Sequence, residues 1–468
     1  MGARTNDEAL TETRGGTAPA GSHLFVGVDI GRFHHLVAAI PQERMENGTW
    51  ERAVARRFST NFDGFTDLVL WLHGFGITTD DVRIGIEPTG GLYSKTVVAW
   101  LVRHDFRVDW LQNWAVHDRR HLLIGKQAKS DSLDARLIAR LLYERECLGL
   151  VGGFLHRTPA TTESLRMLVR NRYKLLTLHT RHRLQLAALE DVIFPEFKEV
   201  FRGSQTKVSA RRVLEHFPTP GELAAAPVED VREVLYRQAH AIRLVHAAER
   251  LHELAGRSAG LTDDVELIVK TQRHLLRQLN VLDDELRIAD AAISEALETW
   301  PARDRAIMAS LPGMSVQRQA VLLSAIGEFA TFRTDRQLRK LLGWYPETLE
   351  SGSSVSKHRL GLSGNRLARR ELWLWSMSIV APRFPANAFK SYYGRLRDRG
   401  LAGHVAIGHV AGKLISVLFH CMRSGQPYDP LRHARDLGLG DVQAVCLGHD
   451  LTGKMWRTEA QRTEADDV

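Results

Sequence analysis

The chain has 468 residues, 44% of them hydrophobic, which is enough for two or three domains with their own cores. A formal net charge of +8 and a pI of about 9.5 favour a polyanionic partner. Cys147, Cys421 and Cys446 are widely separated and show no ligand spacing, so they fit ordinary thiols of a reduced protein rather than a disulfide framework or a zinc site. We see neither a signal-peptide core nor an apolar run of the roughly 18 residues that a membrane span needs, so we expect a cytoplasmic protein without membrane contacts.

The first half of the chain alternates strand and helix signals after a polar N-terminus. Residues 1–22 are small and polar and are expected to be disordered. Residues 23–150 are expected to form one domain, an α/β sheet with an antiparallel edge. Its strands are predicted at Phe25–Ile30, His35–Ile40, Arg52–Phe58, Val82–Ile86 and Phe106–Leu111, and its helices at Phe62–Phe75 and Tyr93–His104.

The second half is predicted to be almost wholly helical. Residues 155–300 are expected to bind nucleic acid and to support oligomerisation, and residues 302–430 to form a further helical domain. Residues 431–468 are a C-terminal extension that is expected to be partly disordered. Within residues 302–430, Ala309–Met314 followed by Ala320–Ile326 fits either a phosphate-binding helix-hairpin-helix or a plain helical corner.

A heptad pattern runs through residues 261–296 and predicts a coiled-coil seam. Gln272 is polar at a seam position, where it costs stability and can fix the register of the pairing. The partner helix is either the segment 163–190 or another chain, and we favour a contribution to oligomerisation. The seam positions are Leu261, Val265, Ile268, Gln272, Leu275, Leu279, Leu282, Leu286, Ala289, Ile293 and Ala296.

Basic residues recur on two of the predicted helices. No acid occurs between Glu163 and Glu190, and Arg166, Arg170 and Lys174 repeat there at a spacing of four. A helix with an apolar stripe and a basic stripe is typical of a nucleic-acid surface, although a solvated helix face gives the same pattern. A second group of candidate contacts consists of Arg366, Arg369 and Arg370.

Four carboxylates carry the strongest chemical signal in the sequence. Asp29 and Glu87 end two predicted strands, and Asp131 and Asp134 share one face of a predicted helix because residues three apart are neighbours. Carboxylate oxygens suit hard Mg²⁺. Two such ions, about 3.5–4 Å apart, can stabilise both oxygens of an in-line displacement at phosphorus. The sequence therefore predicts a divalent-metal site for phosphodiester chemistry.

Each of these acids also has a structural interpretation. Asp131 and Asp134 can simply favour the first turn of a helix, and an Asp after a strand is commonly a turn residue. Lys126 and Lys129 directly precede the helical pair and are candidates for phosphate contacts. Val26–Gly31 also resembles the first phosphate loop of sugar kinases and actin-like ATPases, but we find no convincing match to the downstream glycine segments that this class needs.

Seven short motifs follow one another along the chain in a specific order. They are Gly27–Arg32, Ile86–Gly90, Lys129–Arg136, Leu311–Gly313, Gly343–Pro346, Glu350–Ser354 and Ser424–Pro427. This ordered set, which covers roughly residues 24–430, resembles the IS110-family transposases, the DEDD recombinases of bacterial insertion sequences.

The resemblance implies a RuvC-like N-terminal domain with a ribonuclease H fold, a coiled-coil linker and a mainly α-helical transposase domain. Asp29, Glu87, Asp131 and Asp134 match the family's metal-binding acids, which are expected to hold two Mg²⁺ that Mn²⁺ can replace, and Ser351 matches its nucleophile. It further implies donor and target DNA, a structured guide (bridge) RNA, a dimer or tetramer in which one subunit's acids work with another's serine, and action at the bacterial nucleoid.

From the residues alone, Ser351 lies in a serine- and glycine-rich loop of the kind that usually serves as a linker. Two other functions therefore stay open beside an RNA-guided recombinase. One is a RuvC-like Holliday-junction resolvase or nuclease that uses metal-activated water. The other is a nucleic-acid-binding protein without catalysis.

Overall fold

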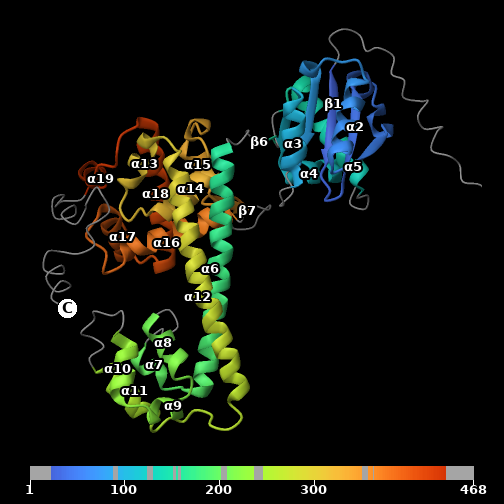
Figure 1. The fold of residues 1–468 in the computed structure, drawn as a ribbon. Helices are drawn as coiled ribbons and strands as arrows, with labels where there is room; N and C mark the ends of the chain where they lie inside the picture. The colour runs from blue at the N-terminus through green and yellow to red at the C-terminus, as the bar shows by residue number, and fades with distance from the viewer. Residues whose placement is uncertain are drawn as a thin grey trace, which may run out of the picture. The chain divides into compact units, whose positions relative to one another are not determined.

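The computed structural model describes residues 23–87, 93–123, 130–150, 154–155, 160–201, 208–236, 246–349, 357–361 and 363–438. The chain divides into two compact units, Met1–Arg157 and Thr158–Val468 (Figure 1). The expectations for residues 1–22 and for the end of the C-terminal extension concern residues outside the described ranges.

Unit 1 is built on a six-stranded mixed sheet with the order β3-β2-β1-β4-β5-β6. The first three strands are antiparallel, β4 and β5 run parallel to β1, and β6 pairs antiparallel with β5. The predicted α/β sheet with an antiparallel edge is confirmed, whereas the short β6 had no sequence signal. The strands are β1 (Leu24–Asp29), β2 (His34–Pro41), β3 (Ala55–Ser59), β4 (Val82–Ile86), β5 (Arg107–Leu111) and β6 (Phe154–Leu155).

Two layers of helices cover the sheet because the strands are apolar on both faces. On one face, α2 (Phe62–His73) and α3 (Tyr93–Arg103) pack on side chains such as Val26, Val28 and Ile84. On the other, α5 (Asp131–Leu148) packs on the sheet together with residues of the short α1 (Gln42–Glu46) and of α4 (Asn113–Leu123). Single 3₁₀ turns at Thr49–Arg52 and Thr79–Asp81 precede β3 and β4.

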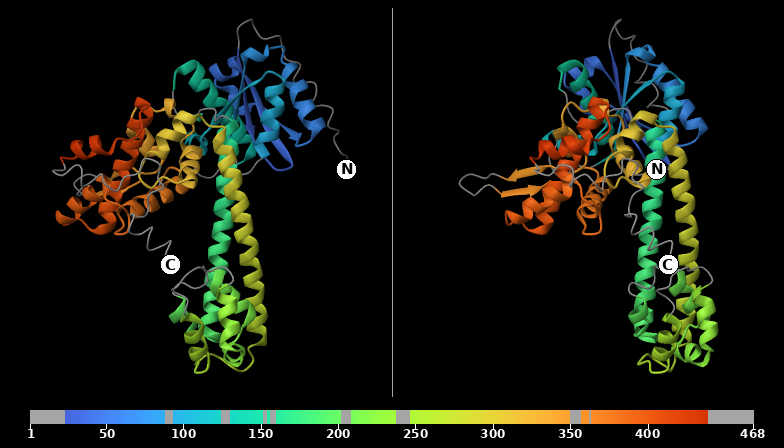
Figure 2. Two further views of the ribbon diagram at one scale, coloured as in Figure 1. Left: turned by 60° about the vertical axis from the view of Figure 1, so that its left-hand side comes forward. Right: turned by 90° about the vertical axis from the view of Figure 1, so that its left-hand side faces the viewer.

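Unit 2 is organised around two long helices, α6 (Ala160–Ile193) and α12 (Glu266–Glu298), which lie side by side (Figures 1 and 2). They are antiparallel, because Arg172 of α6 bonds to Asp290 and His179, seven residues later, to Asp283. Most of the predicted heptad faces inward, since Leu275, Leu279, Leu282 and Ile293 are among its buried members.

The described partner of this heptad face is therefore α6 of the same chain, one of the two alternatives left open by the sequence. The predicted start of the seam is corrected, because α12 begins at Glu266 and the first two heptad positions, Leu261 and Val265, precede the helix. A role in oligomerisation stays a prediction.

A small helical cluster packs at the far end of the helix pair (Figure 2). It has a buried core of its own, which includes Leu186 of α6, Phe197, Leu251 and Leu276 of α12. Arg211 is buried there and forms an ion pair with Asp283 of α12. Its helices are α7 (Phe197–Val200), α8 (Val208–His216), α9 (Pro220–Ala225), α10 (Val228–Tyr236) and α11 (Ala247–Ala255).

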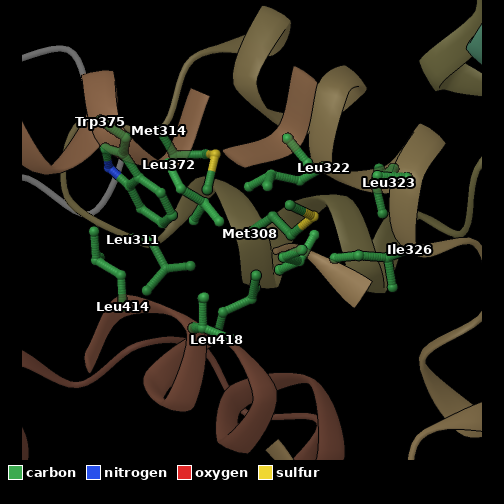
Figure 3. Packing of buried hydrophobic residues seen from close by; sticks show 14 of the residues in the cluster. Met308, Leu311, Met314, Leu322, Leu323, Ile326, Leu372, Trp375, Leu414 and Leu418 are labelled. Atoms are coloured by element: carbon green, nitrogen blue, oxygen red, sulfur yellow. The ribbon is translucent and has the colours of Figure 1, made fainter. Parts of the chain in front are cut away.

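The remaining helices surround a second core at the other end of the pair. Trp375 is fully buried in this core, which it shares with Met308, Leu311, Leu372 and Leu414 (Figure 3). This body consists of α13 (Ala302–Ala309), α14 (Val316–Ile326), the 3₁₀ turn Phe329–Thr331, α15 (Asp335–Leu341), β7 (Pro346–Leu349), β8 (Lys357–Leu360), α16 (Arg366–Val380), α17 (Ala388–Asp398), α18 (Gly403–Ser424) and α19 (Pro430–Asp436).

The corner between α13 and α14 is the segment that fitted either a helix-hairpin-helix or a plain turn. Gly313 has φ +69, and a Cβ there would lie 2.9 Å from Ile379 Cγ2, so both the backbone angle and the close packing favour glycine. The Pro312 carbonyl accepts a hydrogen bond from Trp375 Nε1 at 2.7 Å. These contacts give the corner a packing role, and phosphate binding there stays a prediction.

Helix α18 corrects the expectation that no segment is long and apolar enough to cross a membrane. It has 22 residues and satisfies the length and composition of a span. Its Val410, Leu414 and Leu418 are fully buried in the core of unit 2. Burial inside a helical body accounts for its apolar composition.

Candidate active site

The carboxylates predicted at the strand ends follow two glycines that face α5. A Cβ on Gly27 of β1 would lie 1.9 Å from the Ala135 carbonyl oxygen, and one on Gly85 of β4 would lie 2.8 Å from Ile138 Cγ2. The glycines thus let α5 approach the sheet closely. Because side chains alternate along a strand, Asp29 and Glu87, two residues further on, belong to the same face.

Strand register places these two acids at one edge of the sheet. Strands β1 and β4 are parallel, with Val28 opposite Ile86. Asp29 directly follows Val28, and Glu87 directly follows Ile86. The two acids therefore lie next to each other at the carboxyl ends of neighbouring strands. Both are partly buried and take part in interactions within the chain.

The direction of α5 brings its two acids to the same corner. The Phe25 ring lies 5.5 Å from that of Tyr143, while Gly27 faces Ala135, so α5 runs antiparallel to β1. Asp131 precedes Ala135 by one helical turn, and Asp134 lies at the same distance before Ile138. The first turn of α5 therefore lies toward the carboxyl ends of β1 and β4.

The two helical acids have different surroundings. Asp131 is exposed, whereas Asp134 is only 6% exposed and forms an ion pair with Arg120 of α4. Arg120 Nε donates to Asp134 Oδ1 at 2.9 Å, and Arg120 Nη2 donates to the same oxygen. The sequence offered no signal for this contact, because no spacing rule joins residues that lie fourteen positions apart on two different helices.

Carboxylates are the donor type that hard divalent cations bind. Within the described part of the chain, no three His, Cys, Asp or Glu side chains come together in a group that could already hold a metal ion. The fold thus brings the four acid-bearing segments to one region, and metal coordination by these acids stays a prediction. The predicted phosphate contacts Lys126 and Lys129 lie outside the described residues.

Ser351 lies in the segment that joins β7 to β8 and is outside the described residues. The two strands form an antiparallel hairpin, with Leu349 opposite Lys357, and they project from the helical body as orange arrows in Figure 2. The sequence predicted only a loop here. Ser351 is the second residue after the end of β7 in the sequence.

The base of this hairpin is held by side chains of the helical body. Gly361 N donates to the Tyr345 carbonyl at 2.9 Å, and the Tyr345 hydroxyl lies 2.6 Å from Ser363 Oγ. A Cβ on Gly361 would lie 2.3 Å from Tyr345 Cζ, so the tyrosine ring packs where only glycine leaves room. Arg369 Nη1 donates to the Gly361 carbonyl at 3.0 Å and ties the base to α16.

The predicted nucleic-acid contacts fall into two groups. Arg166 Nε donates to the Ser324 carbonyl at 3.0 Å, so this arginine, like Arg369, helps to hold unit 2 together. The Arg370 guanidinium stacks over the Tyr173 ring, 5.4 Å from its centroid. The exposed members, which are available to a polyanion, are Arg170, Lys174, Arg366 and Arg370.

Comparison with known proteins identifies the chain. Residues 26–195 match the model of the DEDD transposase domain of IS110, and residues 305–394 match that of the transposase IS116/IS110/IS902 family. Together the two models cover more than half of the 468 residues. The chain belongs to the IS110 family of transposases. The first model spans the four acids on unit 1, and the second spans the hairpin, so both halves of the predicted site lie within family domains.

Several relatives resemble this transposase over most of its length. The 44.8 kDa protein of insertion element IS116 from Streptomyces clavuligerus is 25% identical over 408 residues, which are 87% of this chain and 96% of that protein. The 43.6 kDa protein of insertion element IS110 from Streptomyces coelicolor is 28% identical over 308 residues, 65% of this chain and 73% of that protein. The pilin gene-inverting protein of Moraxella bovis is 21% identical over 415 residues, 88% of this chain and 99% of that protein.

The predicted recognition is thereby confirmed, and the chain is a transposase. The DEDD transposase domain also indicates dependence on a divalent metal.

Proposed function

We propose that this transposase is an RNA-guided recombinase in which acids on unit 1 and a serine on unit 2 form one active site. Asp29, Glu87, Asp131 and Asp134 would hold two Mg²⁺, and Ser351 would be the nucleophile. The observation that carries the proposal is the convergence of the four acid-bearing segments on the carboxyl ends of β1 and β4. Three antiparallel strands followed by two parallel ones support a RuvC-like domain.

The reaction is a pair of transesterifications. Ser351 Oγ forms a bond to the scissile phosphorus while the bond to the 3′ oxygen breaks. The serine proton is lost, and the leaving oxygen is released as a 3′-hydroxyl, which leaves a phosphoserine–DNA ester. In the second step, a 3′-hydroxyl of the partner strand attacks phosphorus, and Ser351 Oγ leaves and regains a proton. The number of ester bonds is conserved, so no nucleotide cofactor is needed.

The acids on unit 1 complement the serine. A serine hydroxyl is a weak nucleophile until its proton is removed or its charge is stabilised. Bound Mg²⁺ would supply Lewis-acid stabilisation of the charge that develops on the phosphate. Ser351 belongs to unit 2 and the four acids belong to unit 1, so the proposed mechanism requires the serine to work with acids of the other unit.

Sequence would be read by a guide RNA that pairs with donor and target DNA, as in other RNA-guided systems. Exposed Arg170 and Lys174 on α6 and Arg366 and Arg370 on α16 would contact nucleic-acid backbones through charge. The protein would act as a homo-oligomer on nucleoid DNA in the bacterial cytoplasm. The net charge of +8 supports a polyanionic partner.

A suicide-substrate assay tests the serine. Purified protein, its guide RNA, Mg²⁺ and a nicked target duplex are expected to give a covalent protein–DNA adduct that survives denaturation. Ser351→Ala should abolish the adduct, because the attacking oxygen is removed. Ser353→Ala and Ser354→Ala are matched controls from the same loop and should leave it at the wild-type level.

Two results would count against this mechanism. An adduct formed by Ser351→Ala would place the nucleophile elsewhere. Hydrolysed ends without any adduct would identify activated water as the nucleophile, and with it a RuvC-like nuclease or junction resolvase.

A further inference from the structure

Helix α4 contributes two adjacent arginines that each bind a buried acid of α5. Arg120 pairs with Asp134, and the side chains are 14% and 8% exposed. Arg119 pairs with Glu144, whose side chain is 5% exposed and which Arg140 also binds. Neither pair belongs to the set predicted from the sequence. The first ends on a proposed metal ligand, and the second lies almost three helical turns further along α5.

The geometry of the first pair is asymmetric. An arginine and a carboxylate commonly form a fork, in which two N–H groups bind two different oxygens. Here Arg120 Nε and Nη2 both donate to Asp134 Oδ1. Arg120 therefore fixes one carboxylate oxygen and does not itself occupy Oδ2.

The surroundings of Asp134 restrict the movement of its side chain. Asp134 lies one turn before Ile138, which packs against β4 at Gly85, and it is 6% exposed. A side chain that is buried on this face of α5 and held through one oxygen has little rotational freedom. Hydrogen bonds to the non-ligating part of a metal ligand act in the same way at metal sites, because they orient the atom that binds the ion.

We propose that Arg120 is a positioning residue that holds Asp134 Oδ1 so that Oδ2 is presented to a divalent cation. This inference rests on the proposed metal role of Asp134. It assigns Arg120 to the active site through Asp134, with no contact of its own to the metal or to DNA.

Two other roles for Arg120 predict different effects of its removal on metal affinity. If the ion pair only stabilises the fold, its removal lowers the melting temperature without changing metal affinity. If Arg120 is a counter-ion that competes with the metal, its removal strengthens metal binding. The positioning role alone predicts weaker binding in a variant that stays folded.

Mn²⁺ binding to the full-length chain without nucleic acid tests the inference. Free Mn²⁺ is measured by electron paramagnetic resonance for the wild type, Arg120→Gln, Arg120→Lys and Arg119→Gln. We expect Arg120→Gln to raise the apparent Kd for Mn²⁺ by about tenfold or more, which is the usual cost of removing such a partner. Arg120→Lys should recover part of the affinity, because an ammonium group can donate to Oδ1 but lacks the planar fork.

Arg119→Gln is the matched control. It removes the contact between Arg119 and the buried Glu144, which lies away from the proposed metal site. The variant should therefore lower the melting temperature and leave the Kd for Mn²⁺ unchanged. Equal or tighter binding by Arg120→Gln would overturn the positioning role while leaving the metal site intact. If the wild type itself failed to bind Mn²⁺, the proposed metal site and this inference would both fall.

Discussion

At the scale of single residues, His35 makes the stability of unit 1 depend on pH. The imidazole is fully buried, stacks on Phe65 and accepts a hydrogen bond from Gly31 N at 3.3 Å through Nδ1. Burial, assisted by the neighbouring His34, lowers its pKa from 6.5 to about 4. Gly31 lies in the turn that follows Asp29, so the neutral imidazole supports the turn beside a proposed catalytic acid.

This depressed pKa predicts a loss of stability in mild acid. Between pH 6.5 and about 4 the unfolded chain binds a proton at His35 that the folded chain does not bind, so the free energy of unfolding falls as pH falls. The contribution is complete above pH 6.5 and is about 3 kcal/mol for a shift of this size. It is measured by urea unfolding at intervals from pH 7.5 to pH 4.

His35→Asn supplies the control, because the amide can keep an acceptor near Gly31 N but does not titrate. The variant should show a flatter pH dependence over the same window. If its slope matched that of the wild type, other groups would be responsible for the acid sensitivity.

At the scale of elements, the sequence was most informative where burial imposes a periodic pattern. Val82–Ile86 was predicted with the bounds that β4 has, and Phe62–Phe75 exceeds α2 by two residues. Apolar residues mark both, because each packs on the sheet core. The β7–β8 hairpin was missed, because the serine- and glycine-rich segment between its two strands has the composition of a linker.

The same limit applies to the candidate site. Acids at element ends are visible in the sequence, and their convergence follows from parallel register and from the direction of α5. The Arg120–Asp134 pair was missed because it depends on how α4 packs against α5. Tertiary packing of this kind leaves no fixed spacing in the sequence.

Gln272 gives a prediction for the helix pair. It is 1% exposed on α12, and within the described structure its amide nitrogen and oxygen have no hydrogen-bond partner. A buried polar group without partners costs about 1–3 kcal/mol, so Gln272→Leu should raise the free energy of unfolding of the full chain by about this amount.

A urea titration of the two proteins measures this difference. Gln278→Leu is a control on the same helix, where the amide already bonds to His274 Nε2 at 2.9 Å and is partly exposed, so no gain is expected. Destabilisation by Gln272→Leu would mean that the amide is satisfied, for example by an ordered water.

At the scale of the whole molecule, the proposed chemistry is divided between two units of one chain. The four acids belong to residues 23–150, and Ser351 follows them by more than two hundred residues. Under the proposed mechanism neither unit would hold a complete site, because acids without the serine would favour hydrolysis and the serine without the acids would lack charge stabilisation. A divided site can be completed within one chain or between two, and an oligomer that uses the second route cuts only when it is assembled.

Mixed oligomers distinguish these two routes. Asp29→Asn removes a proposed metal ligand at nearly constant volume, and Ser351→Ala removes the proposed nucleophile, so each variant alone should give no adduct. If acids and serine act between subunits, co-expression of the two at equal amounts should restore about a quarter of the wild-type adduct, because half of randomly formed dimers are mixed and each has one intact composite site.

The adduct should form only on the Asp29→Asn chain, which keeps the serine, and a size tag on that chain identifies it on a denaturing gel. A mixture of Ser351→Ala with the double variant must stay inactive, since it contains no serine nucleophile. If the mixed oligomers gave no adduct while the wild type did, each serine would work with the acids of its own chain. The division of the site would then regulate cutting through the arrangement of the two units within one chain, and assembly would serve only to bring two DNA strands together.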